Sequence, residues 1–372
     1  MIRSVQVAMT SVVVLAMAMA ACGGPPNGNS GSADSTTKFN LTYATFVSKS
    51  DTFAQQAKWF MQQTEERSKG RIAWKSFLDG TLLSAADMFE GVRNGRADAG
   101  HVANVYSPQN LPLSQITVPF LSTDGLAVTK TLETMYSENK DFRDEWESQG
   151  IKVLAFGITG NATVGVNVPV TSLDDLKGKK LRAAGLTGVA LKSIGVDSIG
   201  LTLPETYEAI QRGVVDGFAG FPFATANAAK MPEVAKYNID TGMGVFAVVG
   251  VVSISMRTWK SLPNDLQEVM LDVADEVTDS TVDLVNQAGV KACDDLLAAG
   301  GSVKAIPEAE RKAWMDNMFE STLLPRYKAD ATTAGADPDV VDSFTKAFRK
   351  TLAANEADSS FADGFTACAK RS

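Results

Sequence analysis

Strand-like and helix-like patterns alternate along most of the chain, and this alternation limits the folds that the sequence can adopt. Apolar and polar residues alternate at Phe39–Ala44, whereas apolar residues recur three or four apart between residues 52 and 68. Further strand patterns, separated by helical ones, fall at 71–78, 97–103, 152–158 and 179–184. Because alternating strands and helices assemble as βαβ units, we expect an α/β fold with mostly parallel central sheets.

Residues 245–255 form the longest apolar stretch after the N-terminal segment. The stretch is too short to cross a bilayer as a helix, which needs about 20 apolar residues. Its β-branched residues predict a strand that is buried on both faces, or one that crosses between domains. Beyond Leu262-Pro263 the pattern is helical almost to the end, with predicted breaks near Gly300-Gly301, Pro325 and Asp337-Pro338.

The composition excludes several classes of function. A chain of 372 residues with 45% hydrophobic and 21% charged residues is globular, and its length suggests two to three domains of about 150 residues. A net charge of -8 argues against nucleic acid as a partner. A single histidine, His101, leaves little for a metal site or for histidine-based catalysis. No Cys/His spacing suits zinc, so we expect no metal and no cofactor.

The N-terminus has the pattern of a secretory signal, with Arg3 ahead of an apolar run that ends at Cys22. Met19-Ala-Ala-Cys22-Gly resembles a bacterial lipobox, which implies cleavage before Cys22 and its diacylation. The alternative is a plain signal peptide in which Cys22 is incidental. Gly, Pro, Asn and Ser dominate the next ten residues and predict a flexible tether. We therefore expect a signal at 1–21, a tether at 22–37 and a lipid-anchored protein in the periplasm or on the outer face of the cytoplasmic membrane.

Two cysteines remain once Cys22 carries lipid, namely Cys293 and Cys368. An exported compartment permits disulfides, so these residues are candidates for a bridge. The alternative is a pair of buried thiols that act as small hydrophobic residues.

A dense series of short motifs runs from residue 166 to residue 217. It contains Asn167-x-Pro169, Leu176-Lys-Gly178, Lys180-x-Arg182 and, after a short predicted helix, Glu205-x-Tyr207-x-Ala-x-Gln-x-Gly213-x-x-Asp216-Gly217. In this order and spacing, the series resembles the DctP-like substrate-binding subunits of tripartite ATP-independent periplasmic (TRAP) transporters. Weaker matches at 70–72, 85–92, 95–98 and 118–121 extend the resemblance over about 40–260.

The resemblance implies a two-lobed fold of the periplasmic-binding-protein type, with a hinge and a helical C-terminal region. We expect lobe 1 to contain 38–158 plus about 246–290, and lobe 2 to contain 159–245 plus about 291–372. Such a protein closes around an organic acid and presents it to a TRAP permease in the membrane, without chemistry of its own. Three alternatives remain: a lipoprotein receptor for an ATP-driven (ABC-type) transporter, an envelope hydrolase, and a sensor partner.

Arg182 is the residue most suited to bind an anion. It ends the predicted strand at 179–184, and ligands of open α/β sheets bind beyond the carboxyl ends of strands. Its planar guanidinium can bind a carboxylate through two parallel hydrogen bonds, which lysine cannot do. The resemblance implies the same role for the matching arginine. The alternative is a structural arginine that pairs with a Glu or Asp of the cleft wall.

Two departures from the family pattern bear on the ligand. The family often has a second arginine a few residues before the Asn-x-Pro turn, where this chain has Ala162. It also often has Gln-Glu-Asn-Pro after Asp-Gly, where this chain has a run from Phe218 to Phe223 that includes Phe221. We therefore expect a ligand with one carboxylate and a larger apolar or aromatic part, such as a keto acid or an aromatic acid.

Other candidate ligand contacts follow predicted strands. His101 lies beyond Asp98-Ala-Gly, although a lone histidine is often a structural residue. Phe46 belongs to a loop, 46–49, that can close over the ligand or remain solvated. Asn161 and Thr163 lie where the chain enters the second lobe and can donate hydrogen bonds. Glu205 is better explained as the partner of Thr202 in a helix capping box.

Overall fold

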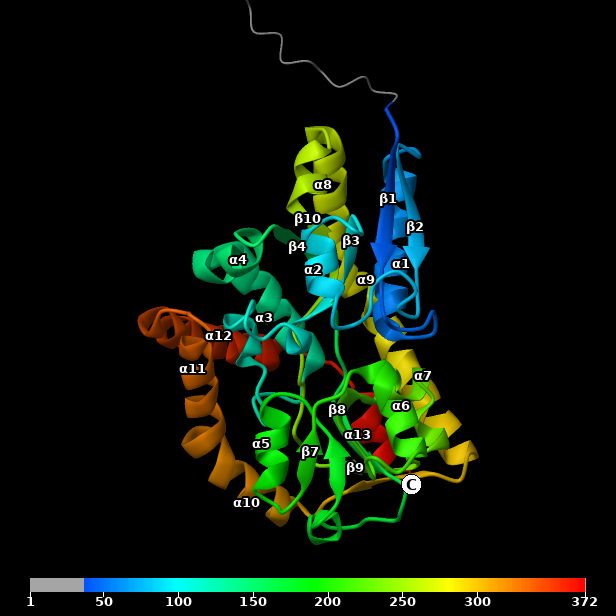
Figure 1. The fold of residues 1–372 in the computed structure, drawn as a ribbon, viewed down its shortest axis with the longest axis vertical. Coiled ribbons are helices and arrows are strands. Elements are labelled where there is room, and N and C mark those ends of the chain that lie inside the picture. Colours follow the sequence, from blue (N-terminus) through cyan, green and yellow to red (C-terminus); the bar gives the residue numbers. More distant parts are fainter. Residues whose placement is uncertain (1–36, 372) are drawn as a thin grey trace, which may run out of the picture. The chain divides into compact units, whose positions relative to one another are not determined.

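Two β-sheets organise residues 37–371, the part of the chain that this computed structural model describes (Figure 1). The first sheet has the spatial order β2 (Ile72–Phe77), β1 (Phe39–Ala44), β3 (Ala99–Ala103), β10 (Val249–Ser255) and β4 (Ile151–Phe156). The second has the order β11 (Ser302–Ala305), β9 (Tyr237–Asp240), β5 (Ala162–Val166), β8 (Gly217–Pro222), β6 (Lys180–Arg182) and β7 (Asp197–Ile199). The predicted signal peptide, Cys22 and all of the predicted tether except Thr37 lie outside the described residues.

Both sheets are mostly parallel, as predicted. Among residues 37–371, β10 is the one strand of the first sheet that runs antiparallel to its neighbours, and β5 is the one such strand of the second. These are the two strands that the chain enters directly from a strand of the other sheet, β5 from β4 and β10 from β9. A strand that arrives from the opposite lobe starts at the cleft and runs away from it, whereas the parallel strands end at the cleft. The two-lobed α/β fold is therefore confirmed.

Helices cover the faces of both sheets (Figure 1). The helices of the first lobe are α1 (Thr52–Arg67), α2 (Met88–Arg93), α3 (Gly125–Glu138), α4 (Lys140–Glu147) and α8 (Met256–Ser261). Those that follow strands of the second sheet are α5 (Leu186–Lys192), α6 (Leu203–Gln211) and α7 (Phe223–Ala228). Short 3-10 helices lie at Asn104–Tyr106, Leu113–Ile116, Asp174–Leu176 and Met231–Glu233.

Local capping explains where several helices begin. The Asp51 side chain accepts a hydrogen bond from Phe53 N–H and caps α1. Thr202 and Glu205 form the predicted capping box of α6, with a proline in its first turn. Before α2, which begins at Met88, the Ser84 hydroxyl donates a hydrogen bond to the Asp87 carboxylate at 2.7 Å and holds the preceding turn.

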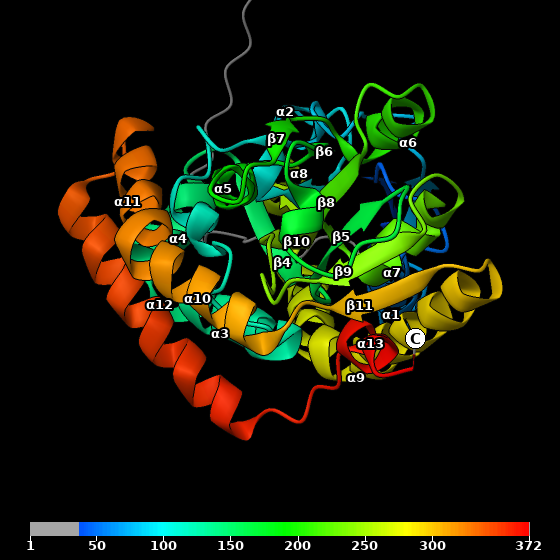
Figure 2. The same cartoon turned by 90° about the horizontal axis from the view of Figure 1, so that it is seen from below.

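The long helix α9 (Asn264–Ala298) joins the two lobes. It packs against α1 and β4 at one end and against α7 and α13 (Gly364–Ala369) at the other (Figure 2). After it comes β11, a strand that the helical pattern of the tail did not predict. The residues of β11 show only a weak alternation between exposed and buried positions, so the sequence carries little strand signal. The strand pairs in parallel with β9, and this long-range pairing determines its structure.

The tail crosses back over both lobes. α10 (Glu308–Met318), a π-helical turn (Phe319–Leu323) and α11 (Leu324–Thr333) follow one another directly, so the chain stays helical here, but the π turn interrupts the α-helix just before Pro325, near the predicted break. Pro325 lies in the first turn of α11, where a missing N–H is tolerated. α12 (Pro338–Asp358) packs on α3 and α4 of the first lobe, and α13 returns to the second. There Cys293 and Cys368 form a disulfide with their Cα atoms 5.5 Å apart.

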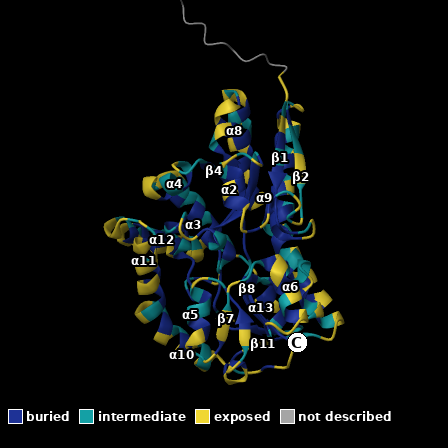
Figure 3. Ribbon diagram, viewed as in Figure 1, coloured by how far each residue is buried: buried dark blue, intermediate teal, exposed yellow. Residues whose placement is uncertain are grey.

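Buried residues run along the strands and the inward faces of the helices (Figure 3). In the first lobe, Phe142, Trp146 and Phe156 pack between α4 and β4, and Phe344 of α12 stacks on Phe142. Every residue of β10 is buried, as its apolar sequence predicted. These cores hold the carboxyl ends of the parallel strands of both sheets in fixed positions beside the cleft.

Candidate functional site

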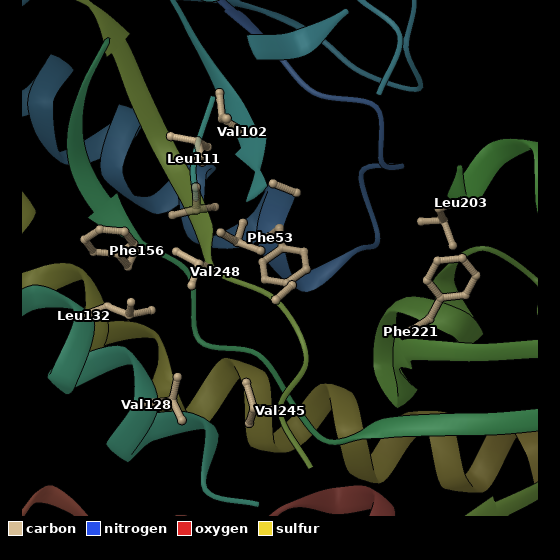
Figure 4. Packing of buried hydrophobic residues seen from close by; sticks show 14 of the residues in the cluster. Phe53, Val102, Leu111, Val128, Leu132, Phe156, Leu203, Phe221, Val245 and Val248 are labelled. Atoms are coloured by element: carbon tan, nitrogen blue, oxygen red, sulfur yellow. The ribbon is translucent and has the colours of Figure 1, made fainter. Parts of the chain in front are cut away.

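A cavity of about 40 Å³ lies between the carboxyl ends of the strands of the two sheets. Its walls are mainly aromatic and aliphatic and come from both lobes, including Phe46, Phe53, His101, Tyr106, Leu203, Phe221, Thr225 and Phe246. Figure 4 shows Leu203 and Phe221 together on the second lobe, with Phe53 across from them on α1. The cavity therefore lies where the family resemblance predicted a ligand site.

Two wider pockets flank this cavity. One, of about 300 Å³, shares Phe46, Val47 and Leu203 with it. The other, of about 390 Å³, shares Val105 and Phe246. The cavity is thus the narrow middle of a longer cleft that runs between the lobes.

Arg182 lies at the end of β6 and has no exposed surface. Its Nε donates a hydrogen bond to the Leu201 carbonyl at 2.7 Å, and its Nη1 donates one to the Ala219 carbonyl at 3.2 Å. Its Nη2 is buried and has no hydrogen-bond partner among the described residues. The backbone therefore fixes two nitrogens of the guanidinium and leaves the third unsatisfied.

No carboxylate of the described residues pairs with Arg182. The ion pairs formed between residues 37 and 371 do not include it. Burial lowers the pKa of Arg182 to about 10, an effect that Tyr106 opposes. A structural arginine paired with an acidic residue of the cleft wall, the alternative from the sequence, does not match this geometry. A buried cation without a counter-ion is costly, so this site favours an anion.

Phe221 and Tyr106 line the cavity next to Arg182. The Phe221 ring centroid lies 3.8 Å from the guanidinium carbon, which places the ring over the cation. The Tyr106 hydroxyl accepts a hydrogen bond from Leu203 N–H at 3.2 Å and so connects the two lobes. Arg182 itself is not among the residues that line the cavity. In this conformation, Phe221 and Tyr106 therefore lie between the cavity and the guanidinium of Arg182 or beside it.

His101 lines the cavity from β3. Its ring stacks on Phe46, with centroids 4.5 Å apart, and lies 5.0 Å from the Phe53 ring. Its Nδ1 hydrogen-bonds with the Thr45 hydroxyl at 3.1 Å, while Nε2 has no partner within residues 37–371. Burial lowers the pKa of His101 to about 3, so the imidazole is neutral at physiological pH. One ring nitrogen therefore has a structural role and the other remains available.

The remaining predicted contacts divide into two groups. Phe46 is buried in the cavity wall, so the solvated loop that was the alternative is wrong for this residue, although Lys49 is exposed. Phe218 is fully buried in the second sheet, next to Gly165, and touches the cavity only through Phe221.

Asn161 and Thr163 point to other partners in this conformation. The Asn161 backbone N–H donates to the Asp363 carboxylate at 2.9 Å, while its side-chain Oδ1 is buried without a hydrogen-bond partner among the described residues. The Thr163 hydroxyl donates to Asn238 Oδ1 at 3.0 Å. Neither residue is in the cavity wall. The physical reason is that the segment before α13 returns to the start of β5, and β5 then runs away from the cleft. The sequence pattern showed neither of these features.

Several residues of the cavity wall were not predicted from the sequence. Tyr106 and Thr225 each follow the carboxyl end of a strand, β3 and β8, within a few residues. Their position just after a strand end was the available sequence signal. Phe53 and Leu203 lie in the first turns of α1 and α6, and both also reach the cavity.

Two further features of the described chain bear on its class. Within residues 37–371, no group of three or more His, Cys, Asp or Glu side chains could hold a metal ion. In the same range, no helix combines the length and the apolar character that crossing a membrane requires.

Comparison with known proteins identifies the family. Residues 43–323 match the family described as bacterial extracellular solute-binding protein, family 7. The chain belongs to this family, the DctP-like solute-binding proteins of TRAP transporters. It is 28% identical over 281 residues to the 2,3-diketo-L-gulonate-binding periplasmic protein YiaO of Escherichia coli strain K12. That match covers 74% of this chain and 84% of the relative. The resemblance predicted from residues 166–217 is confirmed.

Solved structures of TRAP solute-binding proteins share the fold. One from Desulfovibrio salexigens, described as an open complex, is 27% identical, with a TM-score of 0.66 over 84% of this chain and 96% of that one. Another, from a marine metagenome and described as specific for aromatic acid ligands, is 19% identical. Its TM-score is 0.76 over 86% of this chain and 100% of that one. The fold of these solute-binding proteins thus agrees with the family match of this chain.

Proposed function

We propose that this protein captures an organic acid with one carboxylate and an apolar or aromatic part, and delivers it to a TRAP permease. Arg182 binds the carboxylate, and Phe46, His101 and Phe221 contact the remainder of the ligand. Cys22 carries lipid that holds the protein at the membrane. Asn161, Thr163 and Phe218 reach the ligand only in a conformation of the cleft other than the one described.

The observation that carries this proposal is the state of Arg182. A guanidinium that is fully buried, unpaired and missing a partner at Nη2 has unused capacity for one anionic group. A carboxylate at this position satisfies the free nitrogen and offsets the cost of burying the charge. Since Arg182 is the one arginine that is buried among the described residues, one carboxylate is a better match than two.

The cavity wall supports an apolar or aromatic ligand. Aromatic rings supply much of its surface, and ligand pockets are mostly apolar with a few placed polar groups. Its volume of about 40 Å³ is far below the roughly 300 Å³ at which ligand pockets begin. Binding therefore needs the lobes to part or the Phe221 ring to move, which is consistent with a receptor that opens and closes about a hinge.

Family membership supports a TRAP permease as the partner rather than an ATP-driven transporter or a sensor. The YiaO relative is named for binding a sugar acid, which also carries a carboxylate. The lipid anchor rests on the lipobox-like run at 19–23 and the polar tether after it. Mass spectrometry of the N-terminus tests the anchor, because an unmodified Cys22 or a cleavage site elsewhere would contradict it.

A thermal-shift screen across organic acids tests the proposed ligand class. Binding to the native state raises the melting temperature by mass action. We expect shifts with aromatic and 2-oxo monocarboxylates and no shift with the matching amides or methyl esters. Shifts with neutral sugars or cations alone would contradict the proposal.

A further inference from the structure

Asp51 is a buried carboxylate at the cleft, and its helix-capping role uses only one of its two oxygens. The residue precedes α1, and its Oδ1 accepts the capping hydrogen bond from Phe53 N–H at 2.8 Å. The residue is only 1% exposed. Its Oδ2 is buried and has no hydrogen-bond partner between residues 37 and 371.

No cation of the described chain forms an ion pair with this carboxylate. Burial raises the pKa of Asp51 to about 6, although the backbone N–H groups of Phe53 and Ala54 and the nearby Thr225 hydroxyl act in the opposite direction. Capping alone does not explain such a residue, because Asn or Ser caps a helix as well as Asp does without a buried charge. The carboxylate therefore has a cost in the free protein that its cap does not require.

The position of Asp51 connects it to the ligand cavity. It lines the pocket of about 300 Å³, which shares Phe46, Val47 and Leu203 with the cavity. From the second lobe, Thr225 of α7 lines the cavity and lies near enough to lower the pKa of Asp51. The Thr225 Oγ1 also completes no hydrogen bond within the described residues. Each lobe thus brings one unsatisfied oxygen to the same end of the cavity.

We propose that Asp51 and Thr225 form a second polar subsite, which accepts a hydrogen-bond donor on the ligand, either a hydroxyl group or an ammonium group. The inference rests on the proposed function, since it concerns the same ligand. Asp51 Oδ2 is an acceptor only, and a donor from the ligand supplies the bond that the protein does not. Because the two oxygens come from different lobes, a donor between them also links the lobes. The ligand is then an acid with a carboxylate at Arg182 and a donor at Asp51.

The test compares acids that differ only in the donor. Calorimetry measures the binding of 3-phenylpropanoate, its 2-hydroxy and 2-ammonio derivatives, and its ring 3-hydroxy and 4-hydroxy derivatives. In the wild type, we expect at least one donor-bearing acid to bind tenfold or more tightly than the parent acid. A preference for the ammonium compound identifies a zwitterionic ligand, and a preference for a hydroxyl compound identifies a hydroxy acid.

The variant Asp51→Asn separates the subsite from the helix cap, because asparagine keeps the capping oxygen. We expect it to reduce the advantage of the preferred acid to threefold or less while the parent acid binds as before. Thr225→Val should reduce the advantage in the same direction. Asp79→Asn is the matched control, since Asp79 lines the same wider pocket but is exposed. In this variant, the preferred acid should bind more tightly than the parent acid by the same factor as in the wild type.

Two outcomes overturn the inference, and they differ from each other. If the acids bind in an Arg182-dependent manner with the same affinity ratio in the wild type and in Asp51→Asn, Asp51 is a helix cap alone. If none of the five acids binds to the wild type, the proposed function fails together with the subsite.

Discussion

The guanidinium carbon of Arg182 lies 3.8 Å from the centroid of the Phe221 ring, so an aromatic side chain covers one face of a buried, unpaired cation. Such a contact stabilises a desolvated cation by about 2 kcal/mol. It offsets part of the cost of burying Arg182 when no anion is bound. The ring that lies on Arg182 also lines the ligand cavity, so one residue links the state of the cation to the space for the ligand.

Replacing Phe221 should change which acids bind. Phe221→Leu removes the contact with the cation and the flat surface of the cavity wall, while it keeps most of the apolar volume. We expect the preference for aromatic over aliphatic monocarboxylates, measured by calorimetry, to fall by about tenfold. Phe223→Leu is the control, because Phe223 is 3% exposed, against 4% for Phe221, but lies outside the cavity wall. Equal loss of preference in both variants would contradict a specific role for Phe221.

The charge of Asp51 should make the free protein less stable as the pH rises. The pKa of Asp51 is about 6 in the folded protein and about 3.8 when unfolded, so the folded state holds the proton more tightly. Its contribution to the free energy of unfolding is therefore full below about pH 4 and is lost as the pH rises through about 6. We therefore compare the free energy of unfolding of Asp51→Asn with that of the wild type at each pH. The variant minus wild-type difference should be larger at pH 7.5 than at pH 4 by up to about 3 kcal/mol.

Urea unfolding of both proteins from pH 4 to pH 8 measures this difference. His101 titrates in both proteins, so its opposite effect below about pH 6.5 cancels in the comparison. A stability difference that stays constant across this range would show that the buried carboxylate does not titrate as described.

The disulfide should contribute strongly to stability. Cys293 and Cys368 are 75 residues apart in the sequence, and cross-links that close long loops restrict the unfolded chain most. Replacing both cysteines by serine should lower the free energy of unfolding by about 2–4 kcal/mol. Calorimetric melting of the wild type with and without a phosphine reductant, beside the double variant, measures the effect. A melting temperature that neither treatment changes would contradict this prediction.

The parts of the fold that depend on nearby residues were predictable. β1 and α1 follow from local periodicity, and the α6 capping box follows from the spacing of Thr202 and Glu205. The parts that depend on distant partners were not. β11 forms because β9 is beside it, and Asn161 faces Asp363 because α13 returns to the second lobe. Sequence periodicity contains no information on either return of the chain.

The residues of the candidate site also differ in whether local sequence signals could identify them. Arg182 could be assigned because the strand end and the family motif indicate the same residue. Tyr106, Thr225 and Asp51 lie at the cleft only through the juxtaposition of two lobes, and each residue alone has an ordinary local explanation. The ligand-contacting roles of all these residues remain predictions.

Calorimetric titration of the wild type and Arg182→Ala with the monocarboxylate that gives the largest thermal shift tests the central claim most directly. Circular dichroism of both proteins establishes that the variant is folded. The account predicts that the variant loses about 3–5 kcal/mol of binding free energy, which weakens the affinity by about two to four decades. Wild-type affinity in a folded Arg182→Ala variant would show that the carboxylate binds elsewhere.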